Sequence, residues 1–218
     1  MKRLAPLTLI LFVLPSVALA TGGSNDETER LTQSDMTLAK RSAVHKSDLF
    51  AGWRLVRSGP PGPGDDFTCS FDPDLSAFVI TGKHETRFAH NTTGAQLVSG
   101  VFVFRNVRDA AGDFRASAKP GFMRCLRSAV LEGLRQAHLR ARITSSRMST
   151  TPRVGAQSVS YRVVATTYPT KTLPRFHVYA DVLVFRQGRS QAFLLFMAPR
   201  AAVQGQAALA RTVARRMQ

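Results

Sequence analysis

The first regular pattern along the chain is a pair of neighbouring stretches rich in Val, Ile and Phe. They are "SAFVITGKHETRFA" (Ser76–Ala89) and "AQLVSGVFVFRN" (Ala95–Asn106), and the turn-forming run "HNTTG" separates them. These residue types favour strands because their side chains pack well on a pleated surface. The pattern predicts two β-strands joined by a short turn.

The spacing of apolar residues then changes to that of a helix. Val107, Ala110 and Phe114 lie on one helical face, and a second apolar face runs over Phe122–Leu134. Pro120 stands at the expected start of the second helix, where its missing N–H costs nothing. A pair of helices is therefore predicted after the first two strands.

Strand patterns return after residue 138. Four stretches carry them: Leu139–Met148, Gln157–Tyr168, Arg175–Arg186 and Ser190–Ala198. Gln187-Gly188 joins the last two and indicates a hairpin, because Gly accepts positive φ. The nearly continuous apolar run Ala192–Ala198 predicts a central strand that is covered on both faces.

An amphipathic pattern over Val203–Met217 predicts a C-terminal helix. The predicted element order is thus β-β-α-α-β-β-β-β-α. Runs of strands interrupted by a helix pair indicate an α+β fold, with an antiparallel sheet of about six strands flanked by helices.

The first residues have the pattern expected of a secretory leader. Residues 1–20 combine a basic start, an apolar run and the small-x-small sequence Ala18-Leu19-Ala20, as in a cleavable secretory signal. A membrane anchor is disfavoured because Pro15 interrupts the run, which is far shorter than about 20 residues. We expect a secreted or extracytoplasmic protein with no membrane-spanning segment after cleavage.

The next segment, residues 21–46, is expected to be a flexible polar tail. It is rich in Gly, Ser and Thr and lacks periodicity, apart from a short helix over Met36–Val44. Residues 47–218 hold enough apolar residues for a single globular domain. The tail should therefore be removable without unfolding the domain.

Cys69 and Cys125 are the only cysteines. In an oxidising compartment a disulfide between them is favoured over two free thiols. Cys125 also lies on the apolar face of the Phe122–Leu134 helix, where it serves as a small buried hydrophobe whether or not it is bridged. An apolar helix face is the wrong environment for a catalytic thiol.

The formal net charge is +16 at pH 7. Such an excess attracts polyanions, for example acidic lipid headgroups or phosphorylated wall polymers. Arg211, Arg215 and Arg216 in the C-terminal helix form a candidate anion-contact surface. Two alternatives stay open, because arginines near a helix C-terminus suit the helix dipole and an arginine-rich composition also follows from GC-rich coding. No concentrated basic-aromatic run indicates nucleic acid as a partner.

One polar constellation stands out on the predicted strands. Alternation places His177, Tyr179 and Asp181 on one strand face, and the preceding strand carries a similar polar row that includes Arg162. If the rows share a face, Arg162 and Asp181 pair in a polar groove open to a small-molecule or lipid ligand. The alternative is a solvated sheet face with an ordinary cross-strand ion pair.

No catalytic, nucleotide-binding or metal-binding motif occurs in the sequence. His84 and His90 flank Glu85, but their spacing fits no metal motif. No cofactor is expected. An enzyme with His177 and Asp181 as an acid-base pair is the alternative function, although an extended strand separates the two by about 13 Å.

Several stretches between Ser47 and Met217 together carry a family resemblance. In chain order they are "SDLFAGW", then "SFDPDLSAFVITG" after Cys69, "VFVFRNVRDA", "FMRCLRSAV", "DVLVFRQGRSQAFLLF" and "ARRM". This set resembles secreted actinobacterial proteins of the PsbP/Mog1-like group, to whose fold the extracellular sensor domain of PknH-type kinases is related. Phe50 stands where the motif of the group has Pro.

The resemblance implies the PsbP/Mog1-like fold and a role in ligand sensing, and it brings no catalytic residues. We therefore expect a secreted, non-enzymatic binding or sensor-like module that holds a small ligand, a lipid or an anionic envelope component in a groove between sheet and helix. A structural accessory protein of the cell envelope is a further alternative.

Overall fold

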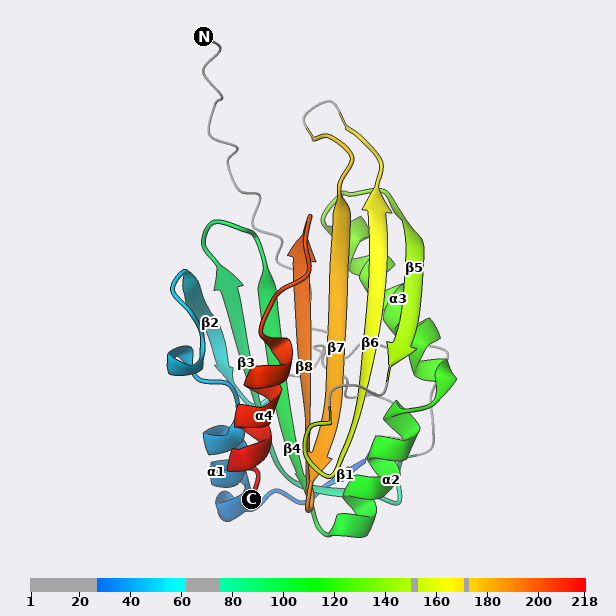
Figure 1. The fold of residues 1–218 in the computed structure, drawn as a ribbon. Helices are drawn as coiled ribbons and strands as arrows, with labels where there is room; N and C mark the ends of the chain where they lie inside the picture. Colours follow the sequence, from blue (N-terminus) through cyan, green and yellow to red (C-terminus); the bar gives the residue numbers. More distant parts are fainter. Residues whose placement is uncertain (1–26, 62–74, 150–152, 171–172) are drawn as a thin grey trace.

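The computed structural model describes residues 27–61, 75–149, 153–170 and 173–218. Within these ranges the chain forms an α+β fold with a mixed sheet and four α-helices (Figure 1). The strands are β1 (Thr28–Glu29), β2 (Trp53–Gly59), β3 (Val79–His90), β4 (Gln96–Phe104), β5 (Ala141–Ser149), β6 (Gln157–Thr167), β7 (His177–Gln187) and β8 (Ser190–Pro199). The helices are α1 (Gln33–Ser42), the 3-10 helix η1 (Lys46–Asp48), α2 (Val107–Ser117), α3 (Pro120–Gln136) and α4 (Gln206–Arg216).

The strand order across the sheet is β1-β3-β4-β8-β7-β6-β5, and β2 pairs with the remaining length of β3. β3 has two partners on one edge because it is 12 residues long. Its start pairs in parallel with β1, and its end pairs antiparallel with β2. All other neighbours are antiparallel. The last strand, β8, therefore lies in the middle of the sheet, between β4 and β7.

The predicted order β-β-α-α-β-β-β-β-α is confirmed for the part of the chain from β3 to α4. The predicted sheet needs a correction, because β1 and β2 raise the strand number from about six to eight and β1 makes the sheet mixed. The predicted β7–β8 hairpin is present, with Gln187 paired to Ser190 across a two-residue turn. Gly188 in this turn has φ of 58°, a conformation that Gly adopts without steric cost.

Helices cover both faces of the sheet, with α1 and α4 on one face and α2 and α3 on the other (Figure 1). β8 is buried on both faces. Its residues Leu194 and Phe196 pack in the core beneath α1 and α4, and Phe193 and Leu195 pack beneath α2 and α3. This confirms the central strand that the apolar run Ala192–Ala198 predicted.

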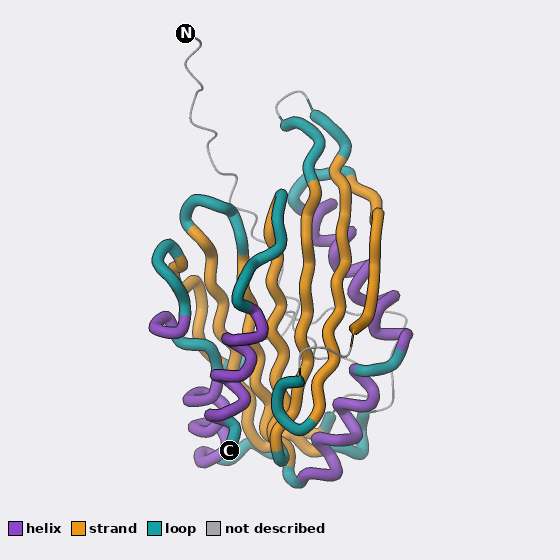
Figure 2. The backbone as a smooth tube through the Cα atoms, viewed as in Figure 1, coloured by secondary structure: helices purple, strands orange, loops and turns teal. Residues whose placement is uncertain are grey.

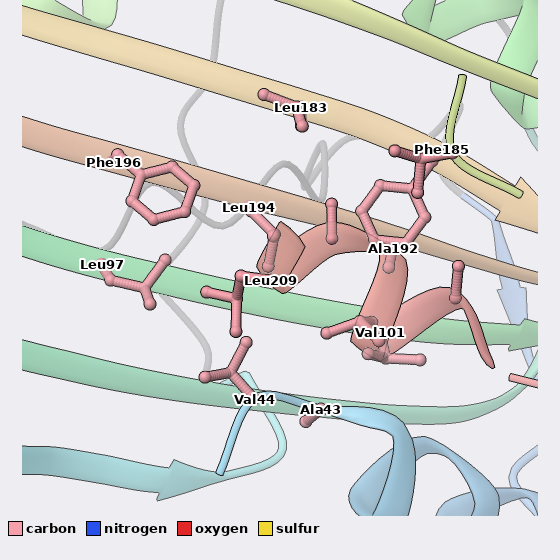
Figure 3. Packing of buried hydrophobic residues seen from close by; sticks show 14 of the residues in the cluster. Ala43, Val44, Leu97, Val101, Leu183, Phe185, Ala192, Leu194, Phe196 and Leu209 are labelled. Atoms are coloured by element: carbon pink, nitrogen blue, oxygen red, sulfur yellow. The ribbon is translucent and has the colours of Figure 1, made fainter. Parts of the chain in front are cut away.

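Figure 3 shows the core on the face of α1 and α4. Leu209 of α4 and Val44, which follows α1, lie over Leu97 of β4 and Leu194 of β8. Val44, Leu97 and Leu194 are inaccessible to solvent. The two helices, although separated by most of the chain, therefore complete the same core.

Side-chain caps fix where the helices begin. The Thr32 hydroxyl accepts a hydrogen bond from the backbone N–H of Asp35 at the start of α1, and the Asn106 side chain accepts one from Asp109 at the start of α2. Each cap satisfies a backbone donor that has no partner within the helix. Pro120 is the first residue of α3, as predicted.

One side of the stretch 33–46 packs into the core, and the prediction of a flexible tail is wrong for this stretch. Ala39 of α1 is fully buried. Asp35 accepts hydrogen bonds at 2.5 and 2.8 Å from Arg189 in the β7–β8 turn. The α1 backbone lies so close to Gly82 of β3 that a Cβ there would collide with it. A few small buried residues and one ion pair thus hold α1 against the sheet, although this helix has little apolar surface.

Candidate functional site

The predicted ion pair between β6 and β7 is present. Arg162 lies directly opposite Asp181 in the sheet register, and its Nε and Nη2 donate to the two carboxylate oxygens at 2.5 and 2.9 Å. Gln206, the first residue of α4, donates a third hydrogen bond to Oδ2 at 2.7 Å. These contacts hold Asp181 buried, whereas 33% of the Arg162 side chain stays exposed. The hydrogen bond to Asp181 is the main cause that raises the pKa of Arg162.

His177 and Tyr179, the other predicted groove residues, continue the row toward the start of β7. His177 Nδ1 lies 2.9 Å from the hydroxyl of Thr166, which in turn lies 3.2 Å from the hydroxyl of Thr144 on β5. The rings of His177 and Tyr179 meet edge to face at 6.3 Å. The four predicted side chains therefore lie on one face of the sheet.

Neighbouring residues of β5 extend this surface. The register places Arg147 opposite Arg162, and Arg142 opposite Thr166. Directly opposite residues of antiparallel strands share a face, so three arginines lie on it. We call this surface the basic face; its members are Arg142, Thr144, Ser145 and Arg147 of β5, Ser160, Arg162, Val164 and Thr166 of β6, and His177 and Tyr179 of β7.

No helix of the described chain covers the basic face. Figure 2 shows β5 and β6 without a helix in front of them, while α3 lies behind and α4 lies nearer the middle of the sheet. Arg142 and Arg147 are exposed. Asp181 is the single carboxylate on β5, β6 and β7, and Arg162 already neutralises it. The surface therefore keeps a positive charge that attracts anions.

Sequence reasoning missed Arg142, Arg147 and Gln206. The two arginines could have been found, because the alternation that gave the row on β6 also runs through β5. Gln206 could not, since the α4 position that reaches Asp181 depends on how the helix returns to the sheet.

A small apolar pocket lies on the opposite side of the sheet, where α3 meets the strand ends. Its volume is about 30 Å³, room for one or two water molecules. None of the predicted groove residues contributes to it. The lining residues are Gly94, Gln96, Leu134, Phe176, Val178, Met197, Ala198 and Pro199.

The three arginines of the predicted anion-contact surface have different environments. Arg216 donates to both carboxylate oxygens of Asp48 in η1, at 2.5 and 2.8 Å. Arg215 is exposed and donates to the hydroxyl of Thr212, and Arg211 is exposed. Arg211 and Arg215 are thus exposed, whereas Arg216 holds η1 against α4.

His84 and His90 form separate contacts. His84 is buried, with Nε2 at 3.0 Å from the Ser58 hydroxyl of β2, and burial lowers its pKa. His90 packs edge-on against Trp53. Within the described ranges, no three His, Cys, Asp or Glu side chains come together as metal ligands.

A buried acid on α2 has no signal in the sequence. Asp113 accepts a hydrogen bond from the Gln191 side chain of β8 and contacts the carboxyl group of Glu27. Burial, the largest effect, raises the pKa of Asp113 above its usual value of 3.8. Three residues so distant in the chain meet only because the sheet brings them together.

The predicted disulfide joins one described and one undescribed position. Cys125 lies on the buried side of α3, where its apolar pattern placed it. Cys69 and the leader, residues 1–20, lie outside the described residues. The disulfide and the secretory signal therefore stay predictions.

Comparison with protein-family models and with curated proteins found no match. The resemblance to the PsbP/Mog1-like group accordingly stays a prediction based on its motifs. None of the described helices is long and apolar enough to cross a membrane.

Proposed function

We propose that the protein is a non-enzymatic binding module whose basic face takes an anionic component of the cell envelope. The observation that carries the proposal is the uncovered surface of β5, β6 and β7, where three arginines share one face with a single, already paired carboxylate. Thr144, Thr166 and Tyr179 belong to the same face and add hydroxyl groups as hydrogen-bonding partners. Phosphate groups suit such a mixture of guanidinium and hydroxyl donors.

The alternative function as an acid-base enzyme has less support. Asp181 is occupied by Arg162 and Gln206, and His177 contacts Thr166. A general acid and base must both reach the reacting atoms, and these two side chains are directed to different partners. A structural accessory role in the envelope is compatible with the same basic surface and differs only in the consequence of binding.

The proposal includes export and membership of the PsbP/Mog1-like group. Export is supported by the signal-like pattern of residues 1–20, and the family by the motifs between Ser47 and Met217. An envelope location would bring the basic face into contact with phosphorylated wall polymers or anionic lipids, which share the phosphate group as ligand chemistry.

The test removes equal charge from two surfaces. Arg142→Gln with Arg147→Gln alters the basic face, and Arg211→Gln with Arg215→Gln is the matched control on α4. We expect the first variant to bind inorganic polyphosphate about tenfold more weakly, a loss of about 1.4 kcal/mol, and the control to change affinity by less than about twofold. Vesicles of phosphatidylcholine with phosphatidylglycerol form a second arm that separates lipid from polymer.

Binding should weaken as salt is added, because exposed charges are screened beyond about 8 Å at physiological ionic strength. Equal losses in both variants would mean that net charge alone attracts the anion, without a defined face. Unchanged binding in both variants, with no salt dependence, would refute an electrostatic function. GC-rich coding alone would then explain the excess of arginines.

A further inference from the structure

Four strands bring polar and basic residues together at one end of the sheet. Arg142 of β5 lies opposite Thr166 of β6, and Thr166 lies opposite His177 of β7. The backbone N–H of Arg200, which directly follows β8, donates to the carbonyl of His177 at 2.7 Å. These residues lie at the upper ends of β5 to β8 in Figure 1. We call them the terminal row; its members are Arg142, Thr166, His177 and Arg200.

The cationic side chains of the terminal row can meet a ligand. Arg142, His177 and Arg200 are exposed. None of the described residues forms a hydrogen bond or an ion pair with the guanidinium group of Arg142 or of Arg200. The His177 ring contacts the Thr166 hydroxyl through Nδ1, at 2.9 Å. Its Nε2 therefore remains for a further partner.

Arg200 has a backbone conformation that residues with a side chain rarely adopt. Its φ is 73°, in the left-handed region, where any residue other than Gly pays a steric cost. His138 is the other such residue in the described chain, and it follows the end of α3, where this conformation is common. Arg200 follows a strand instead. Backbone strain of this kind clusters at ligand-binding sites.

We propose that the terminal row binds the phosphate of a monoester, such as the phosphorylated end of an envelope polymer or lipid. This inference rests on the proposed function of the basic face and names the chemical group that is recognised. A phosphate monoester carries a charge of about −1.5 to −2 at pH 7 and has three terminal oxygens. A diester has a smaller charge and one terminal oxygen fewer, so it satisfies fewer of the donors in this row.

The spacing of the row suits a single phosphate group. Neighbouring strands lie about 4.8 Å apart, so Arg142 is one strand away from Thr166 and Arg200 is one strand away from His177. A phosphate above the contact between Thr166 and His177 lies between the two long arginine side chains. Guanidinium groups bind phosphate with paired, charge-assisted hydrogen bonds.

Arg147 and Arg162, further along the basic face, form a weaker site for such a group. Arg162 already donates to Asp181 through two nitrogens, and this carboxylate repels a second anion nearby. Asp181 is the single acidic residue on β5 to β8, and about 13 Å of extended strand separate it from His177. Arg147 shares its strand, face and exposure with Arg142. It therefore serves as an internal comparison.

The test compares ligands that differ in the type of phosphate ester. Glycerol 3-phosphate is the monoester, and glycerophosphoglycerol is the matching diester. We expect the protein to bind the monoester at least about tenfold more tightly, and the backbone amide signals of Thr166 and His177 to shift on its addition. Vesicles that contain phosphatidic acid, a monoester, or phosphatidylglycerol, a diester, at equal surface charge form a second arm. The same preference in vesicles alone would identify a lipid as the source of the monoester.

Arg142→Gln and Arg200→Gln should each weaken the monoester at least about fivefold and the diester less than about twofold. Arg147→Gln should weaken both ligands alike, because it changes only the general charge of the face. Arg200→Gly should bind the monoester as weakly as Arg200→Gln does. Its melting temperature should equal or exceed that of the wild type, because Gly adopts a positive φ without steric cost.

The proposal is overturned if the wild type binds both esters equally, or if Arg147→Gln removes the preference as Arg142→Gln does. Salt-dependent binding of polyphosphate without a preference for the monoester would refute this inference and leave the proposed function intact. Absence of any salt-dependent phosphate binding in the wild type would refute both.

Discussion

At the scale of single residues, Asp113 has the clearest consequence for pH dependence. The pKa of this buried carboxyl is raised above 3.8 in the folded protein, whereas in the unfolded chain it ionises near that value. Between the two pKa values the unfolded chain binds fewer protons than the folded one. The free energy of unfolding therefore falls as pH rises through this window.

Asp113→Asn should remove this dependence. We expect the variant to gain stability relative to the wild type as pH rises above about 4, at up to about 1.4 kcal/mol per pH unit. Urea unfolding at several pH values measures it. Glu132→Gln is a suitable control, because the hydrogen bond from Arg135 lowers the pKa of Glu132, so any pH dependence that this group contributes has the opposite sign. A constant difference between wild type and Asp113→Asn at all pH values would contradict the argument.

The ion pair of the basic face shows which contacts can be predicted from residue patterns in the sequence. Alternation placed Arg162 and Asp181 in two polar rows and predicted that they pair if the rows share a face, and the register fulfils this condition. Their partner Gln206 and the contact between Asp113 and Gln191 were not predictable. These contacts join elements whose relative positions are set by packing, which no local period encodes.

At the scale of elements, the contact between α1 and β3 depends on Gly82. A Cβ at this position would collide with backbone atoms of Asp35, and backbone cannot move aside as a flexible side chain can. Gly82→Ala should therefore displace α1 and lower the free energy of unfolding by about 1 to 3 kcal/mol. Gly59→Ala on β2 is the matched control, since a Cβ there meets no atom within 4 Å. Chemical denaturation of both variants gives the comparison; equal effects would show that α1 is not tightly seated.

Removal of the N-terminal segment tests the same contact on a larger scale. A chain that starts at residue 47 loses Ala39 and Val44, both fully buried, and leaves Arg189 without Asp35. Burial of a Val side chain alone is worth about 1.5 to 3 kcal/mol, so we expect a loss of more than about 3 kcal/mol or failure to fold. A chain that starts at residue 27 should keep the full melting temperature. Equal melting temperatures for the two chains would support the original prediction that residues 21–46 form a flexible tail.

The elements differ in how well they could be predicted. β3 to β8 carry long apolar runs or strict alternation, and their boundaries agree with the predictions to within a few residues. β2 was not predicted because it is short and its central apolar residues, Leu55 and Val56, are flanked by arginines and face solvent. α1 was recognised as a short helix, but its few small apolar residues gave no sign that it closes a core. Local pattern thus identifies elements that bury much surface and overlooks those held by a few tertiary contacts.

At the scale of the whole molecule, the predicted disulfide would tie residues before β3 to the buried side of α3. Closing the loop between Cys69 and Cys125 restricts the unfolded chain, which stabilises the folded state by about 4 kcal/mol in chain-entropy models. The Cys69→Ser and Cys125→Ser variants should therefore lose similar amounts of stability, and the double variant little more. Thiol titration of the unreduced, unfolded wild type should find no reactive group. Two titratable thiols per chain would refute the bridge.

The position of β8 also determines when the chain can fold. β1 to β4 form one group of strands and β5 to β7 another, and β8 alone joins the two groups by pairing with β4 and β7. During synthesis or export from the N-terminus, residues 190–199 emerge after all the other described strands, so the edges of β4 and β7 stay unpaired until then. Folding is therefore a late, nearly concerted event dominated by contacts between distant parts of the chain, which slows it. Until that moment the two open edges are where the nascent chain is most exposed to aggregation.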